Sequence, residues 1–245
     1  MNYKLLLQYD GTKLNGWQKQ GNTDNTIQGK LEAILERMYG EYVEIHGSGR
    51  TDAGVHALGQ VANFHAPEKF SLEVIQDTLN EYLSKDIRVL SVEIVDERFH
   101  ARLTAKGKTY EYRIDNGKVA NVFQRKFTMR EENPLDLDAM RNAATYFLGT
   151  HDFKTFCANK KMKKSTVRTI TAIEIKENDG IVSIRYTGNG FLYNMVRILT
   201  GTLIEVGRRM RKPEEMKSVI EAMNRGAAGF TAPAQGLFLV NVDYS

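Results

Sequence analysis

The spacing of apolar residues changes several times over the first 105 residues, and the order of these changes is the strongest constraint on the fold. Residues 2–9, NYKLLLQY, predict a β-strand. After a loop rich in Gly, Asn and Asp, apolar residues recur at helical spacing from Thr26 to Gly40, where glycine is a common helix terminator. The chain therefore begins with a strand, a loop and an amphipathic helix.

The next residues continue with strands and a second helix. Ser71 suits the N-cap of that helix, because its hydroxyl can accept a hydrogen bond from a backbone amide of the first turn. The resulting order, β-α-β-β-α-β, is typical of ferredoxin-like and RNA-recognition folds. The expected strands cover residues 41–45, 58–66, 87–95 and 99–114, and the expected helix covers residues 72–83.

The second part of the chain repeats this theme loosely. The tripeptide Asn178-Asp179-Gly180 is a strong hairpin signal, and Pro213 suits the first turn of a helix. We therefore predict an α+β fold with two halves, residues 1–105 and 106–245, around a mixed, largely antiparallel sheet. In the second half we expect helices at 136–148, 191–206 and 213–224 and strands at 166–176, 181–188 and 237–244.

The composition indicates an ordinary globular protein, since 42% of the 245 residues are hydrophobic and 26% are charged. Cys157 is the one cysteine, so the chain has neither an intrachain disulfide nor a cysteine cage for a metal, which indicates a reducing compartment. The N-terminal apolar run, Leu5 to Leu7, is far too short for a signal peptide or a membrane span. We therefore expect a cytoplasmic protein that is not anchored in a membrane.

The net charge of +4 is unevenly distributed. Residues 1–105 contain 11 Lys and Arg against 15 Asp and Glu, a net charge of −4, whereas residues 106–245 contain 23 against 15, a net charge of +8. The basic half is therefore the better candidate for contact with a polyanion. Its two densest basic segments, 159–168 and 207–212, suit contacts with phosphates or form an ordinary solvated surface.

Residues 47–60, GSGRTDAGVHALGQ, set Asp52 close to Arg50 in a glycine-rich loop. One interpretation is structural, with Thr51 or Asp52 capping a short helix at 53–58. The other is catalytic, because a neighbouring guanidinium keeps a partly desolvated carboxylate ionised and glycines let a substrate approach the backbone. A carboxylate held in that way can act as a nucleophile or a base.

Several other kinds of site are excluded or weakly supported. Gly47-Ser48-Gly49 begins a G-x-G-x-x-G motif, but Asp52 occupies the third glycine position and would repel a pyrophosphate. The sequence has no P-loop motif, and its five histidines lack the spacing of metal ligands. Cys157 has no reactive motif around it, which favours a small buried side chain. Tyr110 and Tyr112 share one face of an expected strand, either as core residues or as a platform for base stacking.

Five stretches between residues 9 and 207 follow one another in an order known from one enzyme family. They read YDGTKLNGWQKQ, TIQGKLEAIL, GSGRTDAGVHALGQVANF, FHARLTAKGKTYEYRI and GNGFLYNMVRILTGTLIEVG. These stretches resemble the successive signature blocks of the tRNA pseudouridine synthase A (TruA) family. The segment GRTDAGVHA is long and unusual, so the resemblance is specific.

The resemblance implies the pseudouridine synthase fold, with a catalytic cleft between two ferredoxin- or RRM-like halves. It also implies an isomerase that converts uridine to pseudouridine in the anticodon stem-loop of tRNA, at positions 38 to 40, by base flipping. Members of this family work without a cofactor or metal and usually form a homodimer. The essential aspartate of the family falls on Asp52, the tyrosine that packs against the target base falls on Tyr110, and conserved basic positions fall on Arg50 and Arg197.

The chemistry of that reaction fits a single carboxylate. The C1′–N1 bond breaks, the uracil turns, and C5 joins C1′, with no net oxidation and no loss of atoms. One ionised carboxylate can trap or stabilise an oxocarbenium-like state, while Tyr110 stacks on the flipped base and water is excluded. The sequence leaves open whether Asp52 attacks C1′, attacks C6 or removes a sugar proton. It also leaves two rival functions, an RNA-binding module without chemistry and a hydrolase that uses Cys157 or a His/Asp pair.

Overall fold

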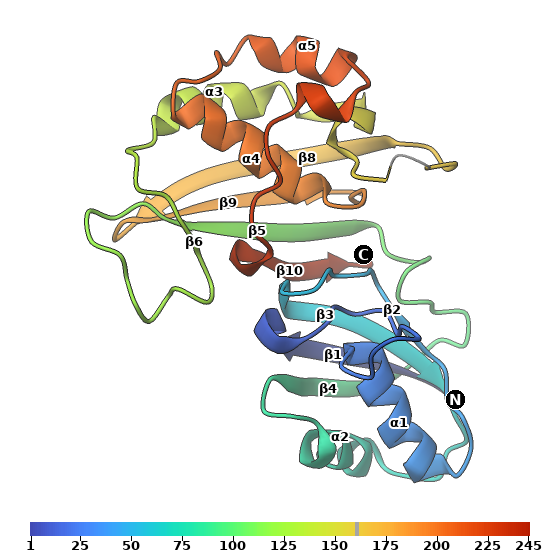
Figure 1. Ribbon diagram of the computed structural model, residues 1–245. Helices are drawn as coiled ribbons and strands as arrows, with labels where there is room; N and C mark the ends of the chain where they lie inside the picture. The colour runs from blue at the N-terminus through green and yellow to red at the C-terminus, as the bar shows by residue number, and fades with distance from the viewer. Residues whose placement is uncertain (160–161) are drawn as a thin grey trace. The chain divides into compact units, whose positions relative to one another are not determined.

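The computed structural model describes residues 1–159 and 162–245 (Figure 1). The chain divides into two compact units: unit 1 consists of Met1–Lys106 and Phe238–Ser245, and unit 2 consists of Gly107–Leu237. The C-terminal residues from Phe238 onward thus belong to unit 1, although the sequence pattern assigned them to the second half. Among the described residues, no helix has both the length and the apolar character needed to cross a membrane.

Unit 1 is built from a sheet and two α-helices (Figure 1). Its elements are β1 (Asn2–Tyr9), α1 (Ile27–Tyr39), β2 (Ile45–Gly47), β3 (His56–His65), α2 (Leu72–Tyr82), β4 (Ile87–Val95) and β10 (Leu237–Asp243). The strand order is β4-β1-β3-β10, with β2 also on β3, and only β3 and β10 run parallel. Tyr3 of β1 stacks on Phe64 of β3 at 5.1 Å between ring centroids, and Tyr39 of α1 meets Phe64 edge-on. Helix α1 therefore packs on the sheet through aromatic contacts.

The ends of these helices follow the sequence signals. Thr26 caps α1 by accepting a hydrogen bond from the Gly29 amide at 3.2 Å, and Gly40 ends the helix with a left-handed φ of 78°. The Ser71 hydroxyl caps α2 by accepting from the Val74 amide at 3.3 Å. The predicted N-cap at Ser71 is therefore confirmed.

Two strands expected in this region are shorter than the sequence pattern predicted. Residues from His100 to Thr104 form a turn in which the Thr104 amide and hydroxyl both donate to the His100 carbonyl, at 3.0 and 2.7 Å. The strand expected at 99–114 therefore begins only after this turn. The strand expected at 41–45 was also wrong in its extent, because pairing with β3 starts at Ile45 and ends at Gly47.

Unit 2 is also α+β, and the three α-helices described in it lie on the same side of its sheet (Figure 1). Its elements are β5 (Gly107–Asp115), β6 (Met129–Arg130), α3 (Leu137–Thr145), β7 (Gly149–Asp152), β8 (Val167–Asn178), β9 (Ile181–Gly188), α4 (Met195–Gly207) and α5 (Glu215–Glu221). The strand order β5-β9-β8-β7 is antiparallel throughout, while β6 pairs in parallel with β5. Asp179 and Gly180 have φ values of 50° and 76°, which confirms the predicted hairpin. The predicted α+β class is confirmed in both units.

Helix α4 is the most buried helix of unit 2 and forms much of its core. It begins at Met195 rather than at the expected residue 191, because Asn194 takes a left-handed φ of 60° and interrupts the helical conformation. The Tyr186 hydroxyl of β9 lies 2.9 Å from Thr200 Oγ1, which joins α4 to the sheet. At Gly201 the chain from Phe230 passes so closely that a Cβ would lie 1.9 Å from the Phe230 carbonyl oxygen.

Replacing Gly201 with alanine should destabilise unit 2, because the added methyl group would overlap a backbone carbonyl against a buried helix. We expect the free energy of unfolding, measured by urea denaturation, to fall by about 1–3 kcal/mol. Gly21→Ala is the control, because no atom lies within 4 Å of its added Cβ. An equal loss of stability in both variants would contradict the steric explanation.

Candidate functional site

Asp52 lies in the loop that joins β2 to β3 in unit 1, and residues 48–55 are called the Asp52 loop below. The Asp52 side chain is partly exposed, whereas the preceding Thr51 is buried. The Val55 amide donates to the Asp52 carbonyl at 3.1 Å, so the backbone turns tightly after this residue. Strand β3 follows directly, so the short helix that Thr51 or Asp52 was expected to cap at 53–58 does not form.

A buried network of polar side chains fixes this loop. The Gln60 side-chain nitrogen donates to the Tyr9 hydroxyl at 3.3 Å and to the Gly49 carbonyl at 3.1 Å. The Ser48 hydroxyl donates to the Gln60 side-chain oxygen at 2.6 Å, and the Tyr9 hydroxyl lies 2.8 Å from Thr51 Oγ1. Burial raises the pKa of Tyr9 to about 12, so its phenol stays neutral and can donate to Thr51 at neutral pH. The first half of the loop is thereby held by side chains of β1 and β3.

The N-terminal loop of unit 1 packs against the Asp52 loop with backbone on backbone. A Cβ on Gly16 would lie 2.6 Å from the Thr51 carbonyl oxygen, and a Cβ on Gly11 would lie 2.1 Å from the Val55 carbonyl oxygen. Gly16 also has a φ of 85°, which side chains other than glycine rarely adopt. The two glycines therefore allow a contact that no other residue type would allow.

Trp17 fills the space beside Gly47 at the start of the Asp52 loop. Its indole is 2% exposed, and a Cβ on Gly47 would lie 2.4 Å from the ring. The Trp17 amide donates to the Thr51 carbonyl at 3.0 Å, and the Trp17 carbonyl accepts from the Gln28 amide at 3.0 Å. Trp17 is therefore held by its side chain and by both of its peptide groups.

His56, the first residue of β3, connects the same region to the C-terminal strand. Its buried ring stacks on Phe238 of β10 at 4.7 Å between centroids, and its Nδ1 accepts from the Gly11 amide at 3.0 Å. His56 therefore links three segments that are distant in sequence, the N-terminal loop, the beginning of β3 and β10.

In unit 2, Tyr110 lies on β5 and is 8% exposed. It pairs across the sheet with Tyr186 of β9, and its ring meets Phe191 edge-on at 5.3 Å between centroids. Tyr112, two residues further along β5, is fully buried and donates from its hydroxyl to the Pro233 carbonyl at 2.7 Å. Tyr110 therefore lies in a row of aromatic side chains with Tyr186 and Phe191, and the neighbouring Tyr112 is fixed by its hydrogen bond.

Arg197 lies in the first turn of α4. Its Nε donates to the Ala232 carbonyl at 2.7 Å, and its Nη1 donates to Asn194 Oδ1 at 2.9 Å. Burial raises the pKa of Tyr112, and the positive charge of Arg197 opposes that rise. The plane of the guanidinium is therefore fixed by the protein itself.

The chain is similar to known proteins over nearly its whole length. A family model described as tRNA pseudouridine synthase matches residues 6–103 and 143–245. The chain belongs to the tRNA pseudouridine synthase family. It is 49% identical to tRNA pseudouridine synthase A of Bacillus sp. (strain KSM-64), 47% to tRNA pseudouridine synthase A 2 of Bacillus anthracis and 45% to tRNA pseudouridine synthase A of Acetivibrio thermocellus, in each case over 99% of both chains. The family predicted from the signature blocks is confirmed.

A solved structure, the crystal structure of a Cbf5-Nop10-Gar1 complex, also matches. The TM-score is 0.37 with 16% identity, over 82% of this chain and 45% of that chain, and this likeness is too weak to bear on function.

In this member of the pseudouridine synthase family, the four predicted site residues lie two in each unit. Arg50 is exposed and shares the Asp52 loop with Asp52, whereas Tyr110 and Arg197 lie in unit 2 around Tyr112. The family model covers Arg50, Asp52 and Arg197, and Tyr110 lies between its two matched ranges.

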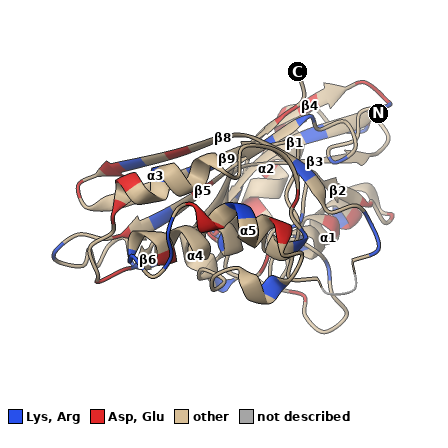
Figure 2. Ribbon diagram, turned by 90° about the horizontal axis from the view of Figure 1, so that it is seen from above, with Lys and Arg blue, Asp and Glu red and all other residues tan. Residues whose placement is uncertain are grey.

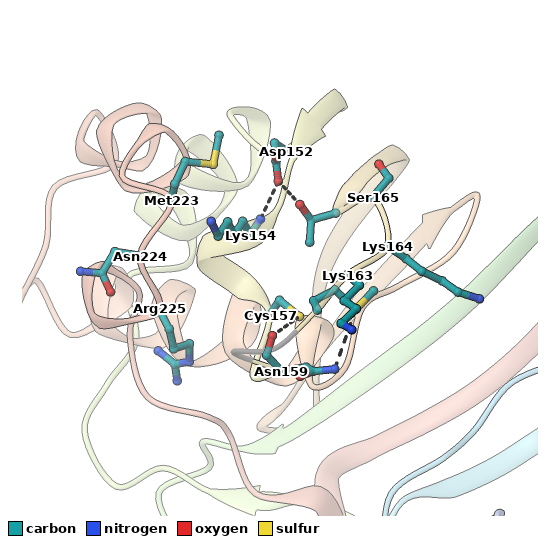
Figure 3. A pocket seen from close by; sticks show the side chains of 12 residues that line it. Asp152, Lys154, Cys157, Asn159, Lys163, Lys164, Ser165, Met223, Asn224 and Arg225 are labelled. Atoms are coloured by element: carbon teal, nitrogen blue, oxygen red, sulfur yellow. Dashed lines mark hydrogen bonds between the residues drawn. The ribbon is translucent and has the colours of Figure 1, made fainter.

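A cavity of about 520 Å³ opens in unit 2 beside the basic segment at 159–168 (Figure 3). The described residues that line it include four cations and one carboxylate, which together carry a net charge of +3. Cys157 is buried in the same wall, as the sequence predicted, and residues 160–161 lie outside the described residues. The charged lining residues are Lys154, Lys163, Lys164, Arg225 and Asp152.

The other basic segment, 207–212, is largely neutralised by carboxylates. Arg208 pairs with the buried Glu131. Burial raises the pKa of Glu131, but the hydrogen bonds from Arg208 and Asn133 lower it by more, so the pKa of Glu131 lies below its usual value. The remaining pairs are Arg209 with Asp136 at 3.1 Å and Arg211 with Glu205 at 2.5 Å. Figure 2 shows the same mixture of acidic and basic positions along the neighbouring helix α5. This segment therefore acts mainly in internal ion pairs.

The sequence patterns gave no role to Tyr9, Gln60 or Trp17, although these residues shape the Asp52 loop. Their one common signal is that they lie in or next to the signature blocks. Gln60 carries a further signal, because it is a polar residue in the middle of an apolar strand pattern and is fully buried.

Replacing Gly47 with alanine should displace Trp17 and loosen the Asp52 loop. We expect the emission maximum of Trp17, the one tryptophan of the chain, to shift to longer wavelength, and the free energy of unfolding to fall by about 1–3 kcal/mol. Gly21→Ala again serves as the control, because its added methyl group meets no other atom. Unchanged emission in Gly47→Ala would contradict the tight fit between the two residues.

Proposed function

We propose that the protein isomerises uridine to pseudouridine in the anticodon arm of tRNA, at positions 38 to 40. One observation carries this proposal: the family's signature loop is present and holds Asp52 partly exposed while Thr51 and Ser48 beside it are buried and hydrogen-bonded. An enzyme needs this combination, because a carboxylate must reach the substrate from a backbone that does not move. Relatives that carry the name tRNA pseudouridine synthase A support the choice of substrate.

In the proposed reaction, Asp52 is the catalytic residue. Its ionised carboxylate stabilises or traps the sugar or the base while the C1′–N1 bond breaks. The uracil then turns and forms the C5–C1′ bond, and the hydrogen that C5 carried leaves as a proton while N1 gains one. The atoms and electrons balance without any oxidant, so no cofactor is needed. Attack on C1′, attack on C6 and removal of a sugar proton are all compatible with this balance.

Tyr110, Arg50 and Arg197 have supporting roles in this proposal. Tyr110 stacks on the flipped uracil and holds it for rejoining, which its fixed position in an aromatic row favours. Arg50 and Arg197 bind the substrate, and Arg50 or Arg197 keeps the carboxylate of Asp52 ionised and oriented. The held guanidinium of Arg197 suits this task, because a cation already in place loses little freedom when substrate binds.

Each unit has a separate task in the proposal. Unit 1 carries the catalytic loop, and the more basic unit 2 carries the surface for the RNA phosphates. The cavity lined by Lys163 and Lys164 is the better candidate for phosphate contacts, because the arginines of segment 207–212 are engaged with carboxylates. The proposal also includes a homodimer in the cytoplasm, as the family resemblance implies.

The two rival functions are less well supported. A thiol hydrolase would need an accessible cysteine, and Cys157 is 4% exposed. An RNA-binding module without chemistry would have no need for a carboxylate on a loop braced by three glycines and a buried polar network.

The proposed activity is tested with an unmodified tRNA transcript tritiated at uracil C5, because formation of the C5–C1′ bond must release that hydrogen. We expect the purified protein to release tritium from tRNAs with uridine at positions 38 to 40. Asp52→Asn should bind tRNA as the wild type does and lose at least about 10²–10⁴-fold in rate. Tyr110→Phe should keep most of the rate if only the ring stacks on the base.

Three outcomes would contradict parts of this proposal. No release from any tRNA with uridine in the anticodon arm would rule out the synthase activity. Substantial release by Asp52→Asn would remove Asp52 from the chemistry. Release from a transcript whose only tritiated uridines lie outside the anticodon arm would exclude the proposed target positions.

The proposed phosphate contacts are tested with the double variant Lys163→Ala/Lys164→Ala. We expect weaker tRNA binding and a decrease of about two in the slope of log K against log salt, about one for each lost phosphate contact. Lys176→Ala is the matched control, because Lys176 pairs with Glu174 at 2.8 Å and lies about 30 Å from Val167 along β8. Equal effects in the double variant and the control would contradict a local phosphate site.

A further inference from the structure

The segment between β5 and β6, residues 116–128, is called the β5–β6 loop below. It turns one of its two phenylalanine side chains, Phe123, into solvent. Phe123 is 86% exposed, and Val119 and Val122 beside it are also exposed. A ring of this size stays in water only where the fold gains nothing by burying it or where a partner covers it. The loop lies between the two ranges that the family model matches, 6–103 and 143–245.

The first half of the β5–β6 loop is held in place by an ion pair between the buried Asp115 and the partly exposed Arg130. Arg130 Nη1 donates to Asp115 Oδ1 at 2.9 Å and to the Gly117 carbonyl at 2.7 Å. The other carboxylate oxygen of Asp115, which is 4% exposed as a residue, accepts from the Asn121 amide at 2.9 Å. These contacts fix the chain on the approach to Phe123.

The second half of the loop is tied down as well. The Gln235 side chain donates to the Arg125 and Thr128 carbonyls, at 3.3 and 3.0 Å. The Thr128 hydroxyl donates to the Gln124 carbonyl at 3.0 Å, and the Phe123 amide donates to Asn121 Oδ1 at 3.0 Å. Phe123 is therefore exposed on a loop whose backbone is fixed by hydrogen bonds. A partner that binds to Phe123 would cost this loop little conformational entropy.

The charge of the β5–β6 loop is purely positive. It contains Lys118, Arg125 and Lys126 and no acidic residue, a charge of +3. Within residues 1–159 and 162–245, no carboxylate lies within ion-pairing distance of these three cations. Arg125 donates to the Val122 carbonyl, which orients its guanidinium without neutralising it. This distinguishes the loop from segment 207–212, whose arginines have acidic partners.

The combination of an exposed ring and unpaired cations favours RNA over protein as the partner. Bases stack on aromatic side chains, and the adjoining phosphates take up the positive charges. A second copy of the chain that met this loop across a two-fold axis would place +3 against +3. The loop also lies on the unit that holds the positive net charge of the chain.

We propose that the β5–β6 loop is a second RNA contact of this protein, in which Phe123 stacks on an exposed base of the tRNA and Lys118, Arg125 and Lys126 contact its phosphates. The base is distinct from the target uridine, because the loop begins at the far end of β5, about 16 Å beyond the proposed stacking residue Tyr110. This inference rests on the proposed function only in taking tRNA as the polyanion.

The stacking contact is tested with Phe123→Ala. We expect the Kd for an unmodified tRNA transcript to rise about tenfold, the size of one lost base–aromatic stack, while kcat at saturating tRNA stays unchanged. Tyr82→Ala is the matched control, because it removes a ring that is 61% exposed on α2 of the acidic unit. Thermal unfolding midpoints should equal that of the wild type in both variants, since neither ring is part of the core.

A second measurement observes the contact directly. In Phe123→Trp the new indole is exposed while Trp17 is 2% exposed, so added tRNA should quench the new emission by stacking on it. Tyr82→Trp is the control and should not be quenched. The double variant Arg125→Ala/Lys126→Ala should lower the salt slope of tRNA binding by about two.

Two results would overturn the proposal. One is tRNA binding by Phe123→Ala that equals the wild type together with no quenching in Phe123→Trp. The other result combines two observations: Phe123→Ala changes its oligomeric state in sedimentation without RNA, and Arg125→Ala/Lys126→Ala leaves the salt slope of tRNA binding unchanged. The loop would then be a contact between copies of the chain. A failure of the proposed function is distinct, because the wild type would then bind tRNA through the loop without releasing tritium.

Discussion

The contact of two backbones without intervening side chains is the constraint on which the candidate site depends. Gly11 and Gly16 let the N-terminal loop reach the Val55 and Thr51 carbonyls, and Gly47 lets Trp17 close the same region. With the backbone fixed in this way, the polar groups of the loop are buried and need internal partners, which Tyr9 and Gln60 supply. The partly exposed carboxylate of Asp52 is therefore carried by a backbone that is held from both sides.

The basic residues of unit 2 divide into two kinds with different physical roles. The arginines of segment 207–212 form ion pairs with Glu131, Asp136 and Glu205. These pairs hold the start of α3 near the end of α4. Among the described residues, no carboxylate forms an ion pair with the cations around the cavity at Lys163 or on the β5–β6 loop, so their positive charge is available to an external anion. Counting charges along the sequence does not separate these two kinds, because Glu131 and Asp136 lie 77 and 73 residues away from their arginine partners.

Local signals were readable from the sequence, and signals that depend on distant partners were not. Gly40, Ser71 and the Asp179-Gly180 turn act through their own backbone and were predicted correctly. The sequence pattern continues as a strand through the turn at His100 and as a helix through the left-handed Asn194. Side-chain and tertiary contacts interrupt the strand and the helix at these residues, and the pattern does not contain these contacts. The same holds for the site: the signature loop pointed to Asp52, whereas Gln60 and Tyr9 lie 51 residues apart and become partners only in the fold. The roles of Asp52, Arg50, Tyr110 and Arg197 stay predictions.

The stacking of His56 on Phe238 has a consequence for biosynthesis. Unit 1 is interrupted by the whole of unit 2, and its last strand, β10, is synthesised only after all of unit 2. Most of unit 1 thus precedes unit 2 in the order of synthesis, but the strand beside β3 and the ring that stacks on His56 follow unit 2. A chain that lacks β10 therefore cannot complete the surroundings of the Asp52 loop, even though it already contains Asp52 and all of unit 2.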